Sequence, residues 1–175
     1  MSELRGRVWI RRINSVVGSF LALLMGGIVL DVTWQVFTRF ILKKPSSYTE
    51  ELAGFLLIWI GLLGASYAFY SRSHLGIDVL TYKLKGVGRQ AVCVITNLMV
   101  FLFAFFVMGW GGIRLVSLTL ALHQVSPALG IKMGYVYIVI PLSGVLIAVY
   151  SVVFIWEGIR SQEALSVEKQ ISQMD

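Results

Sequence analysis

Four long apolar stretches constrain the fold of this chain more than any other feature. A helix needs about 20 residues to cross the hydrocarbon core of a bilayer, and each stretch is longer than that. Their approximate ranges are 13–41, 48–70, 91–122 and 133–156. Composition agrees, since 57% of the 175 residues are hydrophobic and 14% are charged, against about half and a quarter in soluble domains. The sequence therefore predicts an all-α integral membrane protein with four transmembrane helices, forming one membrane domain over residues 1–175.

The distribution of Lys and Arg predicts how the spans are oriented. The net charge of +6 comes from short clusters between spans, which suits loops facing anionic lipid better than a nucleic-acid surface. One side of the membrane would hold Arg5, Arg7, Arg11, Arg12, Arg72, Lys83, Lys85, Arg89, Arg160 and Lys169. The other side would hold Arg39, Lys43, Lys44, Arg114 and Lys132. Because basic residues gather on the cytoplasmic side, both termini are predicted in the cytoplasm, and the loop at Lys43 faces outward.

Two segments outside the spans have the pattern of helices that lie along the membrane surface. Residues 1–12 and residues 75–87 both mix apolar side chains with Lys and Arg, as interfacial amphipathic helices do. A polar loop with incidental apolar residues is the alternative for each. The first apolar run has a basic flank but no small-residue cleavage site after it, so it is expected to be a retained span. The single cysteine, Cys93, excludes an intramolecular disulfide.

Small residues recur at helical spacing along the spans. Such stripes let helix backbones approach closely, which drives helix association in lipid. They predict either packing within the four-helix unit or contact with another subunit. Pro141 lies inside the fourth span and predicts a kink, because it removes one backbone hydrogen bond. The candidate helix-packing residues are Gly18, Ala22, Gly26, Gly54, Gly61, Gly64, Ala65, Pro141 and Gly144.

The sequence lacks the motifs of an enzyme, a metal site or a cofactor site. His74 and His123 fall on opposite sides of the membrane, roughly 30 Å apart, so they cannot share a haem iron. Neither H-E-x-x-H nor G-x-S-x-G occurs. An ion-coupled transporter that works alone normally has broken helices or ionisable residues near the midplane, and no acid is expected at mid-depth here. No catalytic residue, metal or cofactor is therefore predicted.

The acid deepest in the first span is Asp31. It lies about 18 residues from the cytoplasmic entry, or about 27 Å along the helix, which places it near the outer surface. Asp31, Gln35 and Arg39 recur at i, i+4 and i+8 and form a polar stripe. The stripe is either a cap that reaches water or a contact surface for a partner.

Two adjacent acids, Glu50 and Glu51, begin the second span. Ser47 and Glu50 fit a capping box, with Ser47 as N-cap and Glu50 at N3. Both acids also lie at the positive end of the helix dipole. Glu51 is not needed for the cap, so its partner is open: Arg39 in this chain or a residue of another subunit. Tyr48 suits the interfacial aromatic belt.

The stretch "SRSHLGIDVL" follows the second span. It carries Arg72, His74 and Asp78, and the last two could pair at i and i+4 on a helix. A solvated loop and a partner contact are both open interpretations.

Four pieces in order give the chain a resemblance to a known family. They are "VFTRFILKKPSSYTEEL", "LLIWIGLLGASYAF", "SRSHLGIDVL" and "IPLSG". Together with length and span number, they resemble the DctQ-like small membrane subunits of tripartite ATP-independent periplasmic (TRAP) transporters, over residues of about 11–159. Asp31 is not associated with the family pattern.

The resemblance implies a non-catalytic small permease subunit in the bacterial inner membrane. It would bind a large multi-span subunit that carries substrate and sodium ions and moves elevator-fashion, and it would act as that subunit's fixed scaffold. A periplasmic solute-binding protein would deliver a carboxylate such as a sugar acid, a sialic acid or a dicarboxylate, and would dock transiently. Phospholipid is the remaining expected partner.

The resulting hypothesis assigns partner contacts to Arg39, Tyr48, Glu50, Glu51, Asp31, Arg72, His74 and Asp78. Two alternatives stay open from the residues alone. One is a stand-alone four-helix ion-coupled exporter, which would transport substrate when reconstituted by itself. The other is a haem-binding membrane electron carrier, which would show a Soret band.

Overall fold

The computed structural model describes residues 2–43, 46–71 and 87–172, and every element within them is helical apart from short connections. The elements are α1 (Ser2–Phe40), α2 (Ser47–Tyr70), α4 (Val87–Leu102), the π-helix η1 (Phe103–Gly111), α5 (Gly112–Ala121), α6 (Met133–Tyr137) and α7 (Val139–Ser172). Four helical stretches are long and apolar enough to cross a membrane: Trp9–Phe40, Ser47–Tyr70, Val94–Ala121 and Met133–Trp156. The structure thus confirms the all-α, four-span prediction.

The two predicted interfacial helices fare differently. Residues 2–12 are not a separate helix, because α1 runs without interruption from Ser2 to Phe40. Residues 2–40 contain no proline, so the helical hydrogen bonds continue from the basic segment into the span. Most of the second predicted interfacial helix, residues 75–87, lies outside the described residues, and Val87 is the first residue of α4.

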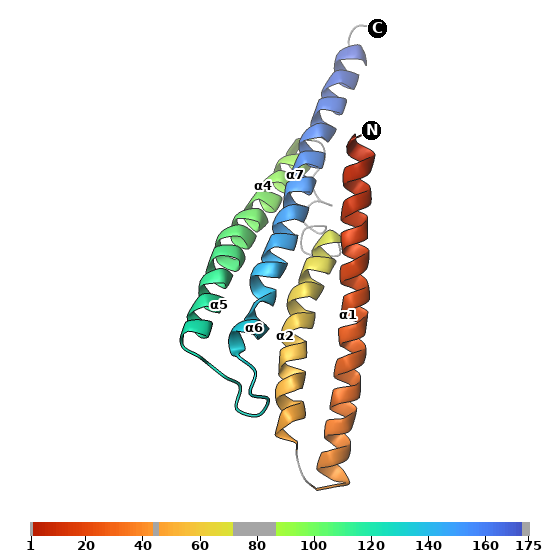
Figure 1. Ribbon diagram of the computed structural model, residues 1–175. Coiled ribbons are helices and arrows are strands. Elements are labelled where there is room, and N and C mark those ends of the chain that lie inside the picture. Colours follow the sequence, from red (N-terminus) through yellow and green to blue (C-terminus); the bar gives the residue numbers. More distant parts are fainter. Residues whose placement is uncertain (1, 44–45, 72–86, 173–175) are drawn as a thin grey trace.

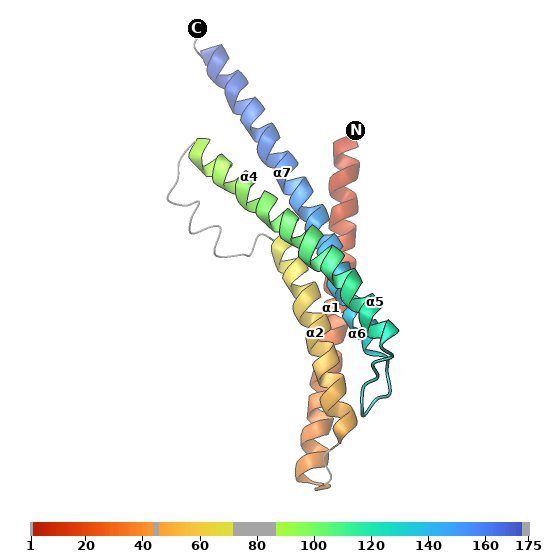
Figure 2. The same cartoon turned by 90° about the vertical axis from the view of Figure 1, so that its left-hand side faces the viewer.

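The helices form a single row rather than a closed bundle. α1 packs against α2, α2 against α7, and α7 against α4, η1 and α5, while the short α6 joins α5 to α7 (Figure 1). Seen from the side, the α4–η1–α5 stretch and α7 lie obliquely to α1 and α2 (Figure 2). α1 is therefore one edge of the row, and α4–η1–α5 is the other.

Both chain ends lie at the same end of the row (Figure 1). The opposite end carries the connection after α1 and the connection between α5 and α6. We call this opposite end the outer end, in keeping with the predicted cytoplasmic termini.

The core of this row is thin. One cluster of buried apolar side chains contains Phe69, Ala104, Ile147 and Tyr150. A second contains Leu24, Leu63 and Val139. The chain itself buries between 11% and 28% of the most apolar stretch of each of the four spans. Most of the apolar surface therefore remains for lipid or for other proteins.

α7 and η1 approach each other closely at Gly144. A Cβ atom added to Gly144 would lie 2.7 Å from Met108 Cβ, 3.0 Å from the Ala104 carbonyl oxygen and 3.1 Å from the Gly109 backbone nitrogen. Ala104 is fully buried. Only a residue without a side chain allows the two backbones to approach so closely.

A second close contact involves Pro141. A Cβ atom on Gly112 would lie 2.9 Å from Pro141 Cδ, so α5 crosses α7 where the proline ring projects. The fourth span is interrupted at Ile138, between α6 and α7. Pro141 cannot donate to the carbonyl four residues earlier, that of Tyr137, and its ring crowds the same group. The interruption lies three residues before Pro141, the residue at which the sequence predicts a kink.

Candidate functional site: the outer hairpin held by Glu51

A short hairpin joins α5 to α6 at the outer end. Its two sides meet at an antiparallel bridge between Val125 and Lys132, and the Ser126 N–H donates to the Ile131 carbonyl at 2.9 Å. Gly130 has φ of +67°, a conformation that glycine adopts at little cost, and its N–H donates to the Ser126 carbonyl at 3.0 Å. The hairpin therefore has a defined backbone conformation.

Glu51 of α2 binds this hairpin through both carboxylate oxygens. The Ala128 N–H donates to Oε1 at 3.0 Å, the Leu129 N–H donates to Oε2 at 3.0 Å, and the Ser126 hydroxyl also donates to Oε2. The Leu129 N–H lies 3.2 Å from Ser126 Oγ as well. Successive backbone N–H groups that converge on one carboxylate form charge-assisted hydrogen bonds. Glu51 thus fixes the hairpin to the N-terminal part of α2.

Two more side chains of α2 reach the α6–α7 stretch. The Trp59 indole donates to the Val136 carbonyl at 3.1 Å, and its ring contacts the Phe20 ring edge-on at 6.2 Å between centroids. The Ser66 hydroxyl lies 3.4 Å from the Ser143 carbonyl. Glu51, Trp59 and Ser66 are spaced by eight and seven residues, which places them within about 80° of one another around the helix axis. One face of α2 therefore holds the hairpin, α6 and α7 in place.

The predicted capping box does not form. The N-cap of α2 is Ser46, which makes no side-chain cap bond, and the helix begins at Ser47. Because the helix begins one residue earlier than a capping box requires, Glu50 occupies N4 rather than N3. Its side chain is exposed. The Thr49 hydroxyl instead donates to the Ser46 carbonyl at 2.9 Å.

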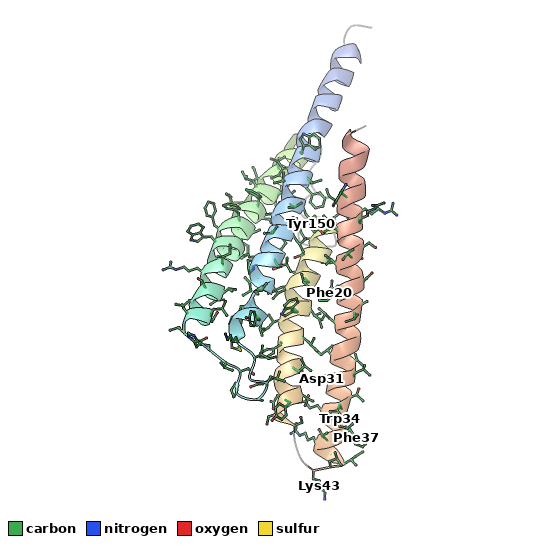
Figure 3. The ribbon with its side chains drawn as sticks, in the orientation of Figure 1. Phe20, Asp31, Trp34, Phe37, Lys43 and Tyr150 are labelled. Carbon is green, nitrogen blue, oxygen red and sulfur yellow. The ribbon has the colours of Figure 1, made fainter. Side chains whose placement is uncertain are left out.

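The other predicted outer-end residues do not join the Glu51 site. Arg39 is exposed, and its guanidinium carbon lies 6.0 Å from the Phe40 ring centroid. Tyr48 is 62% exposed. Asp31 is half-buried, and its Oδ2 atom has no hydrogen-bond partner among the described residues. In Figure 3, Asp31 lies farther from the outer end of α1 than Trp34 does. Glu51 is thus held by backbone groups of its own chain, whereas the sequence suggests Arg39 or another subunit as its partner.

The three remaining contact predictions, Arg72, His74 and Asp78, lie outside the described residues.

The small-residue stripes divide into packed and open positions. A Cβ atom on Gly18 would lie 3.0 Å from the Tyr67 ring, and Gly144 packs against η1. By contrast, a Cβ atom on any of four other predicted packing glycines would meet no atom within 4 Å; these are Gly26, Gly54, Gly61 and Gly64. Ala22 and Ala65 are also exposed. The open positions are available to molecules outside this chain.

The sequence does not predict the residues that donate hydrogen bonds to Glu51. Ser126, Ala128 and Leu129 lie at least 75 positions away along the chain. The local signal was present, because Ser126-Pro127 followed by Gly130 is a turn sequence. It predicts a turn but not which side chain binds it. Among the residues in the described ranges, no three His, Cys, Asp or Glu side chains come together as a metal site.

A row of four helices long and apolar enough to cross a membrane, with Asp31, Glu50 and Glu51 as the acids within those spans, defines a multi-pass membrane protein. The family model described as "Tripartite ATP-independent periplasmic transporters, DctQ component" matches residues 28–161. The chain belongs to this family, and it is therefore a TRAP transporter small permease subunit rather than an enzyme, as the sequence predicted.

Curated relatives agree with this membership. A Haemophilus influenzae protein whose name assigns it as a TRAP transporter small permease protein is 28% identical over 114 residues, covering 65% of this chain and 69% of that protein. The sialic acid TRAP transporter small permease protein SiaQ of Vibrio cholerae is 32% identical over 80 residues, covering 46% of each chain.

A third relative is a much longer chain. The isethionate TRAP transporter permease protein DctMQ of Oleidesulfovibrio alaskensis is 30% identical over 136 residues, covering 74% of this chain and 21% of that protein. The chain thus spans about a fifth of that relative. There, a segment similar to this subunit is joined covalently to a larger permease sequence.

Proposed function

We propose that this chain is the fixed scaffold of a large multi-span subunit in a sodium-driven, binding-protein-dependent TRAP transporter. The single-row fold is the observation that carries the proposal. A row one helix thick leaves two faces and two edges uncovered, and its own core is thin. A second membrane protein therefore has ample apolar surface to pack against.

The positions of the acids support assigning ion coupling to the large subunit rather than to this chain. Residues 87–156, which include the third and fourth spans, contain no Asp or Glu. In the first two spans, Asp31, Glu50 and Glu51 lie toward the outer end, and Glu51 is engaged by the hairpin. Ion coupling in membrane transporters uses ionisable groups or broken helices near the midplane. Substrate and sodium sites therefore belong to the large subunit in this proposal.

We further propose an organic acid anion as the solute, such as a sugar acid, a sialic acid or a dicarboxylate. The names of relatives give sialic acid and isethionate as their solutes, and both are organic anions at neutral pH. A periplasmic solute-binding protein would deliver the solute to the outer end. The hairpin, fixed by Glu51, and the exposed side chains of Arg39, Tyr48 and Glu50 would form this chain's part of the docking surface.

Reconstitution tests the proposal directly. This chain, the large subunit encoded with it and the binding protein are placed in proteoliposomes with an inward sodium gradient, and uptake of radiolabelled organic anions is measured. We expect uptake only when all three are present and the gradient is imposed. The chain alone should transport nothing.

Three results would overturn the proposal. Transport by this chain alone would establish the stand-alone exporter alternative. Full uptake by the large subunit and binding protein without this chain would show that no scaffold is needed. A Soret band on purification would instead indicate the haem carrier.

A further inference from the structure

Arg114 is a charged residue inside a membrane span. The third span covers Val94–Ala121, so Arg114 lies seven residues before its outer end, about 10 Å along the helix axis. Its side chain is exposed. Residues 87–156, which include the third and fourth spans, contain no Asp or Glu that could pair with it. Glu51, at the hairpin, already accepts three hydrogen bonds.

Arg114 lies on the side of α5 that faces away from the other helices. Gly112 packs against Pro141 of α7, and Thr119 is buried on the same side. A residue two positions after Gly112 is rotated by about 200° around the helix axis, which directs Arg114 to the free edge of the row. Trp110, one turn earlier on this edge, is 73% exposed.

The free edge combines a cation with large aromatic side chains. Besides Trp110, it presents Phe103 and Phe106, which are 56% and 60% exposed. Charged residues within membrane spans are costly toward lipid and almost always pair inside protein. Trp and Arg are also the residues that most often dominate the energy of protein–protein interfaces. The opposite edge, α1, also presents exposed aromatic side chains such as Trp34 and Phe37, but its exposed Arg39 lies one residue before the end of the span, where it reaches water.

We infer that the α4–η1–α5 edge is the docking surface for the large subunit, and that Arg114 pairs there with an Asp or Glu in the outer half of one of its spans. Trp110 packs beside this ion pair and excludes lipid from it. The inference rests on the proposed scaffold function, and it adds which edge binds and which charge recognises the partner.

The test uses the whole complex, with this chain tagged and the large subunit co-expressed. The variants are Arg114→Leu and Arg114→Glu, and the matched control is Lys132→Leu, which removes one positive charge from an exposed residue of the hairpin. Removing one member of a buried charge pair should lower the amount of large subunit that co-purifies by about tenfold or more. The control should stay within twofold of wild type.

A rescue experiment separates recognition from misfolding. Single Asp or Glu residues in the outer halves of the large subunit's spans are changed to Arg, and each variant is paired with Arg114→Glu. One of them should restore co-purification, which a damaged fold would not allow. Arg114→Lys keeps the charge and should retain more large subunit than Arg114→Leu.

The outcomes distinguish this inference from the function on which it rests. If wild type captures the large subunit and both Arg114 variants capture it equally well, this edge is not the docking surface, while the scaffold function stands. Loss of bound phospholipid from these variants in native mass spectrometry would then identify a lipid headgroup as the ligand of Arg114. If wild type captures no large subunit, the scaffold function and this inference both fail.

Discussion

Replacing Gly144 by alanine puts a methyl group into the close contact between α7 and η1. The new Cβ atom would lie 2.7 Å from Met108 Cβ, 3.0 Å from the Ala104 carbonyl oxygen and 3.1 Å from the Gly109 nitrogen. Carbon atoms in favourable contact are about 3.5–4.0 Å apart. Two of the three atoms belong to the backbone, and the third is attached directly to it, so no rotamer change relieves the clash. α7 and η1 must therefore move apart by about 1 Å.

The expected cost follows from this displacement. Overpacking a well-packed core destabilises by about 1–3 kcal/mol, and a gap of about 1 Å also removes up to half of the dispersion energy of the atoms lining it. We expect the free energy of unfolding to fall by about 1–3 kcal/mol, which changes the unfolding equilibrium by roughly fivefold to more than a hundredfold. The measurement is unfolding of the purified subunit in mixed micelles by added SDS, followed by tryptophan fluorescence.

Gly61→Ala is the matched control, because a Cβ atom there would meet nothing within 4 Å. The same chemical change should leave stability unaltered, or raise it by about 0.5–1 kcal/mol, since alanine loses less backbone entropy than glycine in a helix. Equal stability of Gly144→Ala and Gly61→Ala would refute the reasoning, because the close approach of α7 and η1 would then have no energetic consequence.

Three further predictions concern the outer end. Glu51→Gln should increase hydrogen–deuterium exchange and proteolysis of the hairpin, because one carboxylate oxygen becomes an NH₂ group that cannot accept from the backbone; Glu50→Gln is the control and should change neither. Trp59→Phe should lower the free energy of unfolding in SDS by about 0.5–1.5 kcal/mol, since it removes the hydrogen bond to the Val136 carbonyl; no change would mean that this bond does not hold α6. Gly130→Ala should destabilise by about 1 kcal/mol because its φ of +67° is unfavourable for alanine; thermal unfolding of wild type and variant measures this, and unchanged stability would contradict the turn geometry.

The two adjacent acids at the start of α2 show what local sequence predicts and what it does not. The sequence predicts a helix beginning at this point, and α2 does begin at Ser47. It assigns the local role to Glu50 and leaves Glu51 without a partner. The structure reverses the emphasis, because Glu50 is exposed and Glu51 accepts the hydrogen bonds of the hairpin. A shift of one residue at the helix start removes the capping box, and helix ends are set by such small differences.

The small-residue stripes show the same limit. Spacing alone predicts that Gly18, Gly61 and Gly144 favour helix packing, without stating against what. The structure places Gly18 and Gly144 in contacts within the chain and leaves Gly61 open. The difference depends on which helices are neighbours in the row, and the sequence of a single helix does not predict its neighbours.

The sequence by itself determined the class of protein, the number of spans and the family resemblance, because hydropathy and short motifs are properties of neighbouring residues. Only the tertiary structure decided that the helices form a row, that Glu51 binds the hairpin and that Arg114 lies on a free edge. Each of these depends on where residues far apart in the chain meet. The Glu51 contacts, for instance, join positions separated by 75 to 78 residues. A carboxylate near a helix start is equally compatible with water, a partner subunit or a distant turn. Only the packing of the helices brings one of these within hydrogen-bonding distance.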